Sequence, residues 1–268
     1  MGDTILDEIV AAVRRRLESI PEAPGLESDA REAAEARRAG GLRSLRSALA
    51  GPGPAVIAEC KKASPSAGVI RADFDPRALA LAYADAGAAA ISVVTEPDFF
   101  GGAPRWLAQV RGAVELPVMR KDFIVSRRQL LETCVLGADA VLLIHRLLDR
   151  DTLADLLALA GELDLEVLLE VFTDEDPAPA VESGAAVIGV NARNLATFEV
   201  RLDRVEEMAD ELPADRVRVA ESGIDDSETM GALHEAGYDA FLVGEHLVRA
   251  DDPGEALRRL LGAGAGPC

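Results

Sequence analysis

The chain has 268 residues, a length that suits one large domain of the α/β-barrel type and does not require a second domain. Its 47 acidic residues outnumber its 28 basic ones and leave a formal net charge of -19, whose field repels polyanions. Nucleic acid and anionic membranes are therefore disfavoured as partners, and a substrate that carries phosphate would need a local positive site.

The cysteines, Cys60, Cys134 and Cys268, are widely spaced and form no CxxC pair, which suits a reducing compartment and gives no zinc signature. No apolar stretch approaches the ~20 residues of a membrane span. The N-terminus lacks the basic and apolar segments of a signal peptide. We expect a cytoplasmic protein without a membrane partner, and a monomer, with a weak dimer as the alternative.

Residues 1–48 are expected to form a helical extension that packs on a barrel domain spanning residues 49–268. Apolar residues recur in this extension at helical spacing at Ile5, Leu6, Ile9, Val10, Val13 and Leu17. A second helix is expected from about Ser28 to Ala39. An amphipathic helix must bury its apolar stripe, and the end of the barrel is the nearest candidate surface.

From about residue 55 onward, continuously apolar runs alternate with helical patterns, as expected for parallel strands that are buried on both faces. The expected strands are Ala55–Glu59, Ala90–Val94, Pro117–Arg120, Ala140–Ile144, Glu166–Val171, Val187–Val190, Val217–Ala220 and Ala240–Val243. The expected helices are Pro76–Ala86, Ser126–Leu136, Leu153–Leu163, Asp174–Ser183, Leu202–Leu212, Ser227–Ala236 and Pro253–Leu261. Repetition of one strand-helix unit predicts an α/β fold of the (β/α)8 TIM-barrel class.

In such a barrel the active site is built at the C-terminal ends of the strands. The expected strand ends carry the polar residues Glu59, Lys61, Thr95, Glu96, Lys121, Asp122, His145, Glu170, Asn191, Arg193 and Glu221. Glu59 and Lys61 are two residues apart, so both should face the same way, with Cys60 turned opposite. Charges that converge on a small mouth shift one another's pKa values, as acid–base chemistry requires. The alternative, ion pairs that merely close the barrel, accounts less well for so many charged strand ends.

Lysine occurs in this chain only at positions 61, 62 and 121. Arginine supplies a permanent charge, whereas a partly buried lysine can be tuned to act as an acid or as a Schiff-base nucleophile. The placement of all these lysines beside expected strand ends indicates chemistry. The alternative is that the composition is simply poor in lysine.

Glycine-containing turns follow the last two expected strands, at Ser222-Gly223 and at Gly244-Glu245. Barrels commonly bind phosphate at this place through backbone N–H groups, which glycine allows to approach closely. His145 is a candidate acid or base, while His234 and His246 are expected on a helix or on the surface. The histidines show none of the spacings typical of a metal site, so we expect no metal.

Several segments then carry a family resemblance. They are Ile57–Gly68, Ser92–Gly102, Pro117–Ile124, Leu168–Val171, Ile188–Leu195 and Ala220–Ile224. The ExKxxSPS run from Glu59, together with RKDF and GVNxRNL, is highly specific. Over roughly residues 5–260 the chain resembles the indole-3-glycerol phosphate synthase family, cofactor-free barrel enzymes of tryptophan biosynthesis.

This resemblance implies the conversion of 1-(2-carboxyphenylamino)-1-deoxyribulose 5-phosphate into indole-3-glycerol phosphate, with release of carbon dioxide and water and without any cofactor. Carried over by motif, Lys121 corresponds to the general acid of ring closure and Glu170 to the general base of dehydration. Lys61 would contact the acidic groups of the substrate and share in proton transfer, and Glu221 would steady the cationic intermediate.

The resemblance also implies which residues position and bind the substrate. Glu59 and Asn191 would be positioning residues, and Arg193 would neighbour the anthranilate carboxylate. The full set of implied substrate-binding residues is Ser64, Phe100, Phe123, Arg193, Leu195, Ser222, Gly223, Gly244 and Glu245. Within this set the phenylalanines would contact the aromatic ring of the substrate. Ser64 and the glycines would surround its phosphate, and Glu245 would contribute its backbone N–H.

Three other functions remain open. Another phosphate-binding barrel, such as phosphoribosylanthranilate isomerase, needs no lysine on the third strand, so Lys121 counts against it. A Schiff-base aldolase would form a covalent adduct that borohydride traps. A non-catalytic sugar-phosphate binder would bind its ligand without releasing carbon dioxide.

The acidic surplus, the 4% aromatic content and the scarcity of lysine are typical of a protein that works in concentrated salt. There, screening removes the cost of self-repulsion. An acidic bacterial enzyme from a GC-rich genome, which also replaces lysine by arginine, is the alternative. We favour the salt-adapted interpretation.

This interpretation predicts that the fold becomes more stable in molar salt. Repulsion among carboxylates should fade as the Debye length falls from ~30 Å at about 0.01 M to ~3 Å near 1 M. Thermal melts from roughly 0.05 to roughly 3 M potassium chloride, which span these limits, measure the effect. A melting midpoint that stays flat or falls would contradict salt adaptation.

Overall fold

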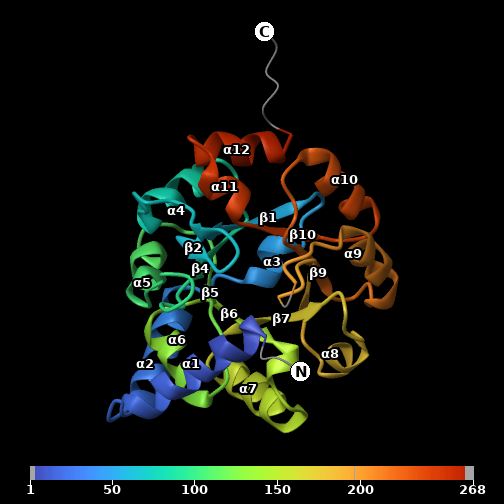
Figure 1. Ribbon diagram of the computed structural model, residues 1–268. Coiled ribbons are helices and arrows are strands. Elements are labelled where there is room, and N and C mark those ends of the chain that lie inside the picture. Colours follow the sequence, from blue (N-terminus) through green and yellow to red (C-terminus); the bar gives the residue numbers. More distant parts are fainter. Residues whose placement is uncertain (1–3, 196, 263–268) are drawn as a thin grey trace.

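The computed structural model describes residues 4–195 and 197–262 (Figure 1). Within these residues, eight parallel strands close into a barrel in the order β1-β10-β9-β8-β7-β6-β5-β4. The barrel strands are β1 (Ala55–Cys60), β4 (Ala90–Val94), β5 (Val118–Lys121), β6 (Ala140–Ile144), β7 (Glu166–Phe172), β8 (Val187–Asn191), β9 (Val217–Glu221) and β10 (Ala240–Val243). The predicted (β/α)8 barrel is confirmed. Cys268 lies outside the described residues.

Each expected strand is present, and its ends lie within one residue of the expected positions. Several of the differences fall at C-terminal ends, where Lys121, Asn191 and Glu221 still belong to their strands. They continue the parallel ladder because ladder hydrogen bonds join backbone groups whatever the side chain. Asn191, for example, lies opposite Glu221 in the register between β8 and β9. These polar side chains are therefore held by the sheet and not by loops.

Both faces of the barrel sheet are buried, which explains the continuous apolar runs. Along β1, Ile57 belongs to an inner core inside the barrel, while Val56 and Ala58 belong to an outer core between the strands and the helices. Cys60 lies in the outer core, so it points away from Glu59, as expected. The same alternation aims the side chain of Glu59 into the barrel mouth.

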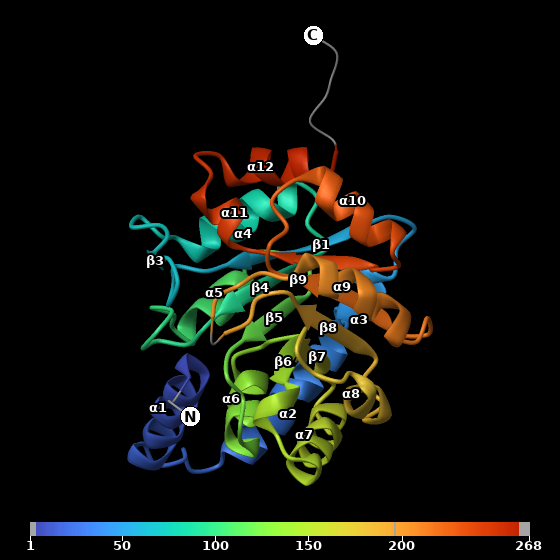
Figure 2. The same cartoon turned by 45° about the vertical axis from the view of Figure 1, so that its right-hand side comes forward.

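The helices surround the barrel (Figure 2). Those that follow barrel strands are α4 (Pro76–Asp85), α5 (Arg105–Arg111), α6 (Arg127–Val135), α7 (Arg150–Glu162), α8 (Ala178–Glu182), α9 (Leu202–Met208), α10 (Ser227–Glu235) and α12 (Pro253–Leu260). Shorter elements are the 3-10 turns η1 (His145–Leu147) and η2 (Ala209–Glu211), helix α11 (Glu245–Arg249) and an antiparallel hairpin of β2 (Ala63–Ser64) and β3 (Gly68–Val69).

Most of these helices begin where an Asp or Ser side chain accepts backbone N–H groups of the first turn, as Asp149 does for α7. The helix expected from Asp174 begins later, at Ala178, because a turn comes first: Glu175 accepts the N–H of Phe172 at 2.7 Å. The helix expected to reach Leu212 ends at Met208 and continues as η2. Helices α5 and α11 and the β2–β3 hairpin are absent from the expected elements because they are too short to show a clear period.

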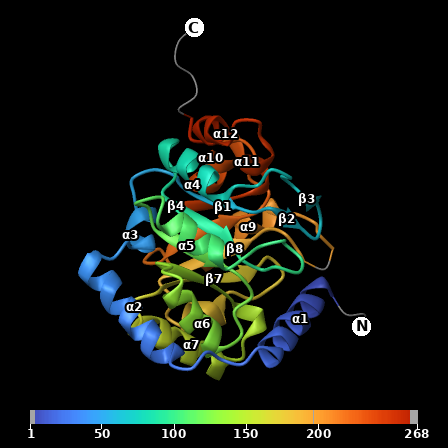
Figure 3. The ribbon, with the colours of Figure 1, turned by 90° about the vertical axis from the view of Figure 1, so that its left-hand side faces the viewer.

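Helices α1 (Ile5–Ser19), α2 (Leu26–Gly40) and α3 (Leu45–Leu49) precede β1. Figure 3 shows α1 and the β2–β3 hairpin at one end of the barrel and α3 at the other. Ile9 and Val13 of α1, and Leu45 and Leu49 of α3, are buried in the inner core. Helix α2 packs along α6. None of the helices formed by residues 4–195 and 197–262 has the length and apolar character needed to cross a membrane.

Candidate active site

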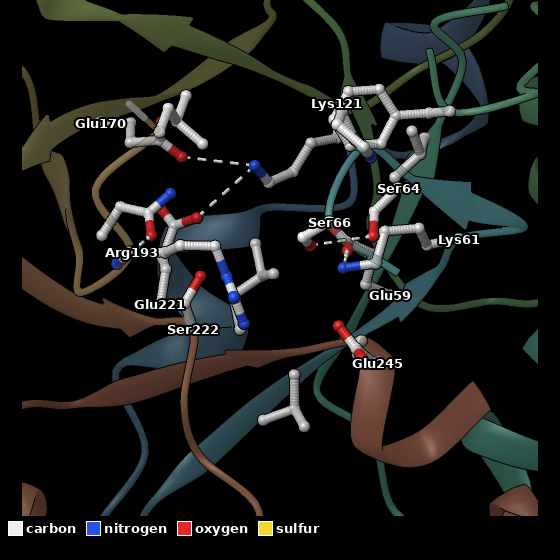
Figure 4. A pocket seen from close by; sticks show the side chains of 18 of the residues that line it. Glu59, Lys61, Ser64, Ser66, Lys121, Glu170, Arg193, Glu221, Ser222 and Glu245 are labelled. Atoms are coloured by element: carbon white, nitrogen blue, oxygen red, sulfur yellow. Dashed lines mark hydrogen bonds and ion pairs between the residues drawn. The ribbon is translucent and has the colours of Figure 1, made fainter. Parts of the chain in front are cut away.

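A cavity of about 400 Å³ opens at the C-terminal ends of the barrel strands (Figure 4). The structure brings together at this cavity every residue that the family resemblance assigns to catalysis or substrate binding, whereas His145, the other candidate acid or base, lies outside the described residues that line it. The assigned residues are Glu59, Lys61, Ser64, Phe100, Lys121, Phe123, Glu170, Asn191, Arg193, Leu195, Glu221, Ser222, Gly223, Gly244 and Glu245.

Lys121 ends β5 and extends its ammonium group toward Glu170, near the end of β7, and Glu221, at the end of β9 (Figure 4). Its Nζ lies 3.3 Å from Oε2 of Glu170 and 3.6 Å from Oε2 of Glu221. Burial would lower the pKa of Lys121, but the carboxylates of Glu170, Glu221 and Glu59 outweigh it and raise the pKa well above its usual range. Lys121 therefore carries its proton at neutral pH.

Glu221 is buried without full compensation of its charge. Neither of its carboxylate oxygens has a hydrogen-bond partner among the described residues. Burial, and then the neighbouring carboxylate of Glu170, raise the pKa of Glu221 well above its usual range. Gly189 makes room for this side chain, because a Cβ there would lie 2.3 Å from Oε1 of Glu221. In the free protein the environment of Glu221 therefore favours its neutral form more than water does.

A second ion pair occupies the end of β1. Lys61 Nζ lies 3.0 Å from Oε1 of Glu59, whose side chain is buried. Burial would raise the pKa of Glu59, but the ammonium groups of Lys61 and Lys121 outweigh it and lower the pKa. Glu59 is therefore ionised and can hold Lys61 in place. A Cβ at Gly244 would lie 2.6 Å from Oε1 of Glu59, so this glycine allows the end of β10 to pass close by.

Phe100 and Phe123 form an aromatic wall, with ring centroids 5.9 Å apart and a tilt of 41°. A buried network holds the loop that carries Phe123. Asp122 accepts the N–H of Phe123 at 2.9 Å and pairs with Arg120 at 2.8 Å, while the side chain of Gln129 donates to the Phe123 carbonyl at 2.8 Å. Although Asp122 is at the rim of the cavity, its carboxylate is engaged by this network and not aimed at a ligand.

Turns after β1 and β9 form another part of the cavity wall. Ser64 accepts the N–H of Ala67 at 3.2 Å, and its hydroxyl lies 3.3 Å from that of Ser66. After β9, Ser222 and Gly223 adopt positive φ values of 70° and 74°. Such a conformation is strained for serine by ~1–3 kcal/mol and is concentrated at functional sites. Because the turn is held in this shape, its backbone faces the cavity beside the start of α11.

The loop after β8 closes the site between the turns and the carboxylates. Asn191 accepts the N–H of Arg193 at 3.0 Å, and Arg193 pairs with Val200 in an isolated bridge. Arg193 and Leu195 then reach the cavity. Arg193 gives this side a permanent positive charge suited to a carboxylate.

Some strand-end residues take other positions. Thr95, Glu96 and His145 lie outside the described residues that line the cavity. Thr95 bonds to Asp122 and Arg120, and His145 Nδ1 lies 3.6 Å from a carboxylate oxygen of Glu175. The geometry therefore gives His145 no direct contact with a ligand in the cavity.

Other lining residues are absent from the expected set. Ile5 and Ile9 of α1 reach the cavity, as do Phe198, His246 and Arg249. The amphipathic pattern of the first helix could have identified these isoleucines. It predicted that the apolar side of this helix would pack against the end of the barrel. His246, expected on a helix or on the surface, lies on α11 at the cavity rim. No group of His, Cys, Asp and Glu side chains within the described ranges is placed to hold a metal ion.

The fold and this cavity define a barrel enzyme whose ionisable groups converge at the C-terminal strand ends. Among solved structures, 3-hexulose-6-phosphate synthase from Salmonella typhimurium has a TM-score of 0.63 at 17% identity, covering 78% of this chain and 98% of that chain. Thiamine phosphate pyrophosphorylase from Pyrococcus furiosus has a TM-score of 0.59 at 16% identity, covering 82% and 97%. These likenesses show the barrel fold.

Sequence comparison is more specific. The family model of indole-3-glycerol phosphate synthase matches residues 6–260. Indole-3-glycerol phosphate synthase from Salinibacter ruber is 48% identical, covering 97% of this chain and 96% of that protein. The protein of the same name from Polaromonas sp. is 45% identical, covering 96% and 98%. The chain belongs to the indole-3-glycerol phosphate synthase family.

The raised pKa of Glu221 predicts a stability cost that grows with pH. The folded chain keeps a proton on this group that the unfolded chain releases above its ordinary pKa of 4.5. Stability from this site is therefore fully present below that value and is lost as the pH rises toward the folded pKa. We expect Glu221→Gln to melt about 2–4 °C above the unaltered chain at pH 8, the shift that ~1 kcal/mol gives in a large domain.

Melting curves between about pH 5 and pH 9 test this expectation, because the gap between variant and unaltered chain should widen with pH. A variant that melts lower by the same amount at every pH would show that Glu221 is not held protonated.

Proposed function

We propose that this chain converts 1-(2-carboxyphenylamino)-1-deoxyribulose 5-phosphate into indole-3-glycerol phosphate, carbon dioxide and water. The observation that carries the proposal is the ammonium group of Lys121, 3.3 Å from Glu170 and 3.6 Å from Glu221, at the mouth of a barrel that belongs to this family. The charges needed for the reaction and an aromatic wall thus share one cavity.

The chemistry requires protons and charges at defined places. Ring closure joins the aromatic carbon that bears the carboxylate to the ketose carbonyl carbon, and the carbonyl oxygen takes up a proton. The ring nitrogen then becomes a cationic iminium, which accepts the electron pair left by the departing carbon dioxide. Loss of water and of a ring proton completes the indole. Each step is served by a positioned acid, base or counter-charge.

Lys121 acts as the general acid for the ketose oxygen in this proposal. Its pKa, raised by the surrounding carboxylates, keeps it protonated before the substrate binds. Glu170, within hydrogen-bonding distance of Lys121, is the base of the dehydration and can return a proton to the lysine. The ring proton taken by Glu170 thus restores Lys121, and the departing hydroxyl group leaves as water with one further proton taken up from solvent.

Glu221 steadies the cationic intermediate. A buried carboxyl group is easily drawn into its ionised form by a nearby positive charge, because little water competes for the interaction. Lys61 contacts the acidic groups of the substrate and shares in proton transfer, with Glu59 and Asn191 as positioning residues. The 3.0 Å pair of Lys61 with Glu59 supports this arrangement.

The substrate is bound by opposite walls of the cavity. Phe100 and Phe123, with Leu195, contact the aromatic ring, while Arg193 neighbours its carboxylate. The phosphate lies among Ser64, Ser222, Gly223, Gly244 and the backbone of Glu245. The acidic net charge disfavours nucleic acid and anionic membranes as partners. We further propose that the protein is cytoplasmic and a monomer, with a weak dimer as the alternative.

The decisive assay is to incubate the chain with the carboxyphenylamino-deoxyribulose phosphate and to follow indole fluorescence and carbon dioxide release. Growth of both signals is expected without any added metal or cofactor. Binding without carbon dioxide release would favour a sugar-phosphate binder, and an adduct trapped by borohydride would favour an aldolase.

Substitution of the acid tests its role. We expect Lys121→Arg to lower kcat by at least ~100-fold, because arginine keeps the charge but does not readily donate its proton. Lys62→Arg is the matched control, since Lys62 lies outside the described lining residues of the cavity. Near-normal turnover of Lys121→Arg, or an equal loss in the control, would remove Lys121 from this role.

The phosphate assignment predicts that inorganic phosphate competes with the substrate. We expect Gly244→Ala to raise KM and the inhibition constant of phosphate about tenfold, ~1.4 kcal/mol. It should also lower kcat, because the new methyl group would lie 2.6 Å from Oε1 of Glu59, the partner of Lys61. Gly53→Ala is the control, since a Cβ there meets nothing within 4 Å among the described residues. Phosphate inhibition that is non-competitive, or untouched in Gly244→Ala, would contradict the assignment.

A further inference from the structure

Glu96 is a buried carboxylate near the cavity that the proposed chemistry does not use. It follows β4, its side chain is fully buried, and it lies outside the described residues that line the cavity. Burial of a carboxylate is costly unless hydrogen bonds or charges compensate it. The hydrogen-bond and ion-pair partners of Glu96 therefore indicate its role.

Both oxygens of Glu96 accept hydrogen bonds from consecutive backbone N–H groups of the following loop. Oε1 accepts from Asp98 at 3.0 Å, and Oε2 accepts from Phe99 at 2.7 Å and from Phe100 at 3.2 Å. Hydrogen bonds to an ionised acceptor are about twice as strong as those between neutral groups. The carboxylate thus defines the shape of the loop up to Phe100.

The same loop is closed by its backbone. The N–H of Gly102 donates to the carbonyl of Glu96 at 2.7 Å, and a Cβ at Gly102 would lie 2.6 Å from the carbonyl carbon of Thr95. Residues 96–102 therefore fold back against the end of β4. Phe100 is carried on this closed loop into the cavity, where its ring meets that of Phe123.

Helix α1 is joined to the same carboxylate. Arg16 Nη1 lies 3.4 Å from Oε1 of Glu96 and 2.6 Å from Oδ2 of Asp98. Ile5 and Ile9, at the other end of α1, line the cavity. One buried carboxylate therefore holds both the Phe100 loop and the helix that carries the neighbouring apolar wall.

We propose that Glu96 is a positioning residue that sets the affinity of the cavity for the aromatic half of its ligand. It acts through Phe100 and, by way of Arg16, through Ile5 and Ile9. It takes no part in proton transfer, because its oxygens are occupied by the loop. This inference rests on the proposed function for the identity of the ligand, an anthranilate-type ring, but not for the geometry of the wall.

Glu96→Gln is the sharpest test. It keeps the size of the side chain but replaces an acceptor oxygen by an amide group, which cannot accept the N–H groups of the loop. We expect KM for the substrate to rise about tenfold while kcat stays within about threefold, the signature of lost uniform binding. Affinity for anthranilate, measured by calorimetry, should fall about tenfold, ~1.4 kcal/mol, and inhibition by inorganic phosphate should not change.

Asp139→Asn is the matched control. Asp139 is also a buried carboxylate, which accepts the N–H of Val118 at 3.0 Å and pairs with Arg111 at 2.9 Å, but it precedes β6 at the opposite end of the barrel. Its replacement should lower the melting midpoint without changing the affinity for anthranilate. A second comparison, Arg16→Ala against the exposed Arg15→Ala, should weaken anthranilate binding in the first variant only.

The outcomes are separable. Failure of the unaltered chain to turn over the substrate would refute the proposed function, while anthranilate titration would still test the wall. Unchanged anthranilate affinity in Glu96→Gln, an equal change in Asp139→Asn, or no anthranilate binding by the unaltered chain would each overturn the positioning role. So would a parallel fall of kcat and phosphate affinity, which would indicate a general structural defect.

Discussion

The packing of opposite charges into the mouth of the barrel is the constraint on which the rest of this structure depends. Carboxylates at or near the C-terminal ends of β1, β7 and β9 surround the ammonium group of Lys121, although buried charges of like sign repel and lose their hydration. The lysine keeps its proton, and Glu221 is driven toward its neutral form. Burying these charges lowers the stability of the folded chain. The rest of the fold must therefore provide enough stabilising free energy to offset this cost.

The barrel provides this stability because its apolar cores lie apart from the polar residues at the strand ends. Apolar side chains fill the inner core below the cavity and the outer core beneath the helices, so the polar residues occupy the strand ends. Gly189 and Gly244 complete the arrangement by leaving space for Glu221 and Glu59. Because Glu59, Lys121, Glu170 and Glu221 stand on strands, the spacing of their backbones is fixed by the ladder and does not depend on loop motion.

Apart from Lys61, which serves both, the residues proposed for binding and those proposed for proton transfer lie on different parts of the molecule. The acid and base candidates lie on β5 and β7, whereas the walls that would hold a ligand come from loops and from α1. Buried polar side chains hold the loops that line the cavity. Asp122 and Gln129 bond to the backbone of Phe123, and Glu96 bonds to the backbone of Phe100. Changes in these side chains should alter affinity more than chemistry.

The sequence by itself determined the barrel and the charged strand ends, because apolar runs, helix periods and strand-end polarity are local signals. It also identified Lys61 and Lys121 through the scarcity of lysine. The other cavity residues, such as Phe100, Phe123 and Leu195, were expected from the family resemblance and not from a local pattern. Only the tertiary structure decided between residues with the same local signal: Glu221 ends a strand and Glu96 closely follows one, yet the first enters the cavity and the second binds its own loop. The contact of Ile5 and Ile9 with the cavity was likewise decided by long-range packing, since no local period specifies which surface an amphipathic helix covers.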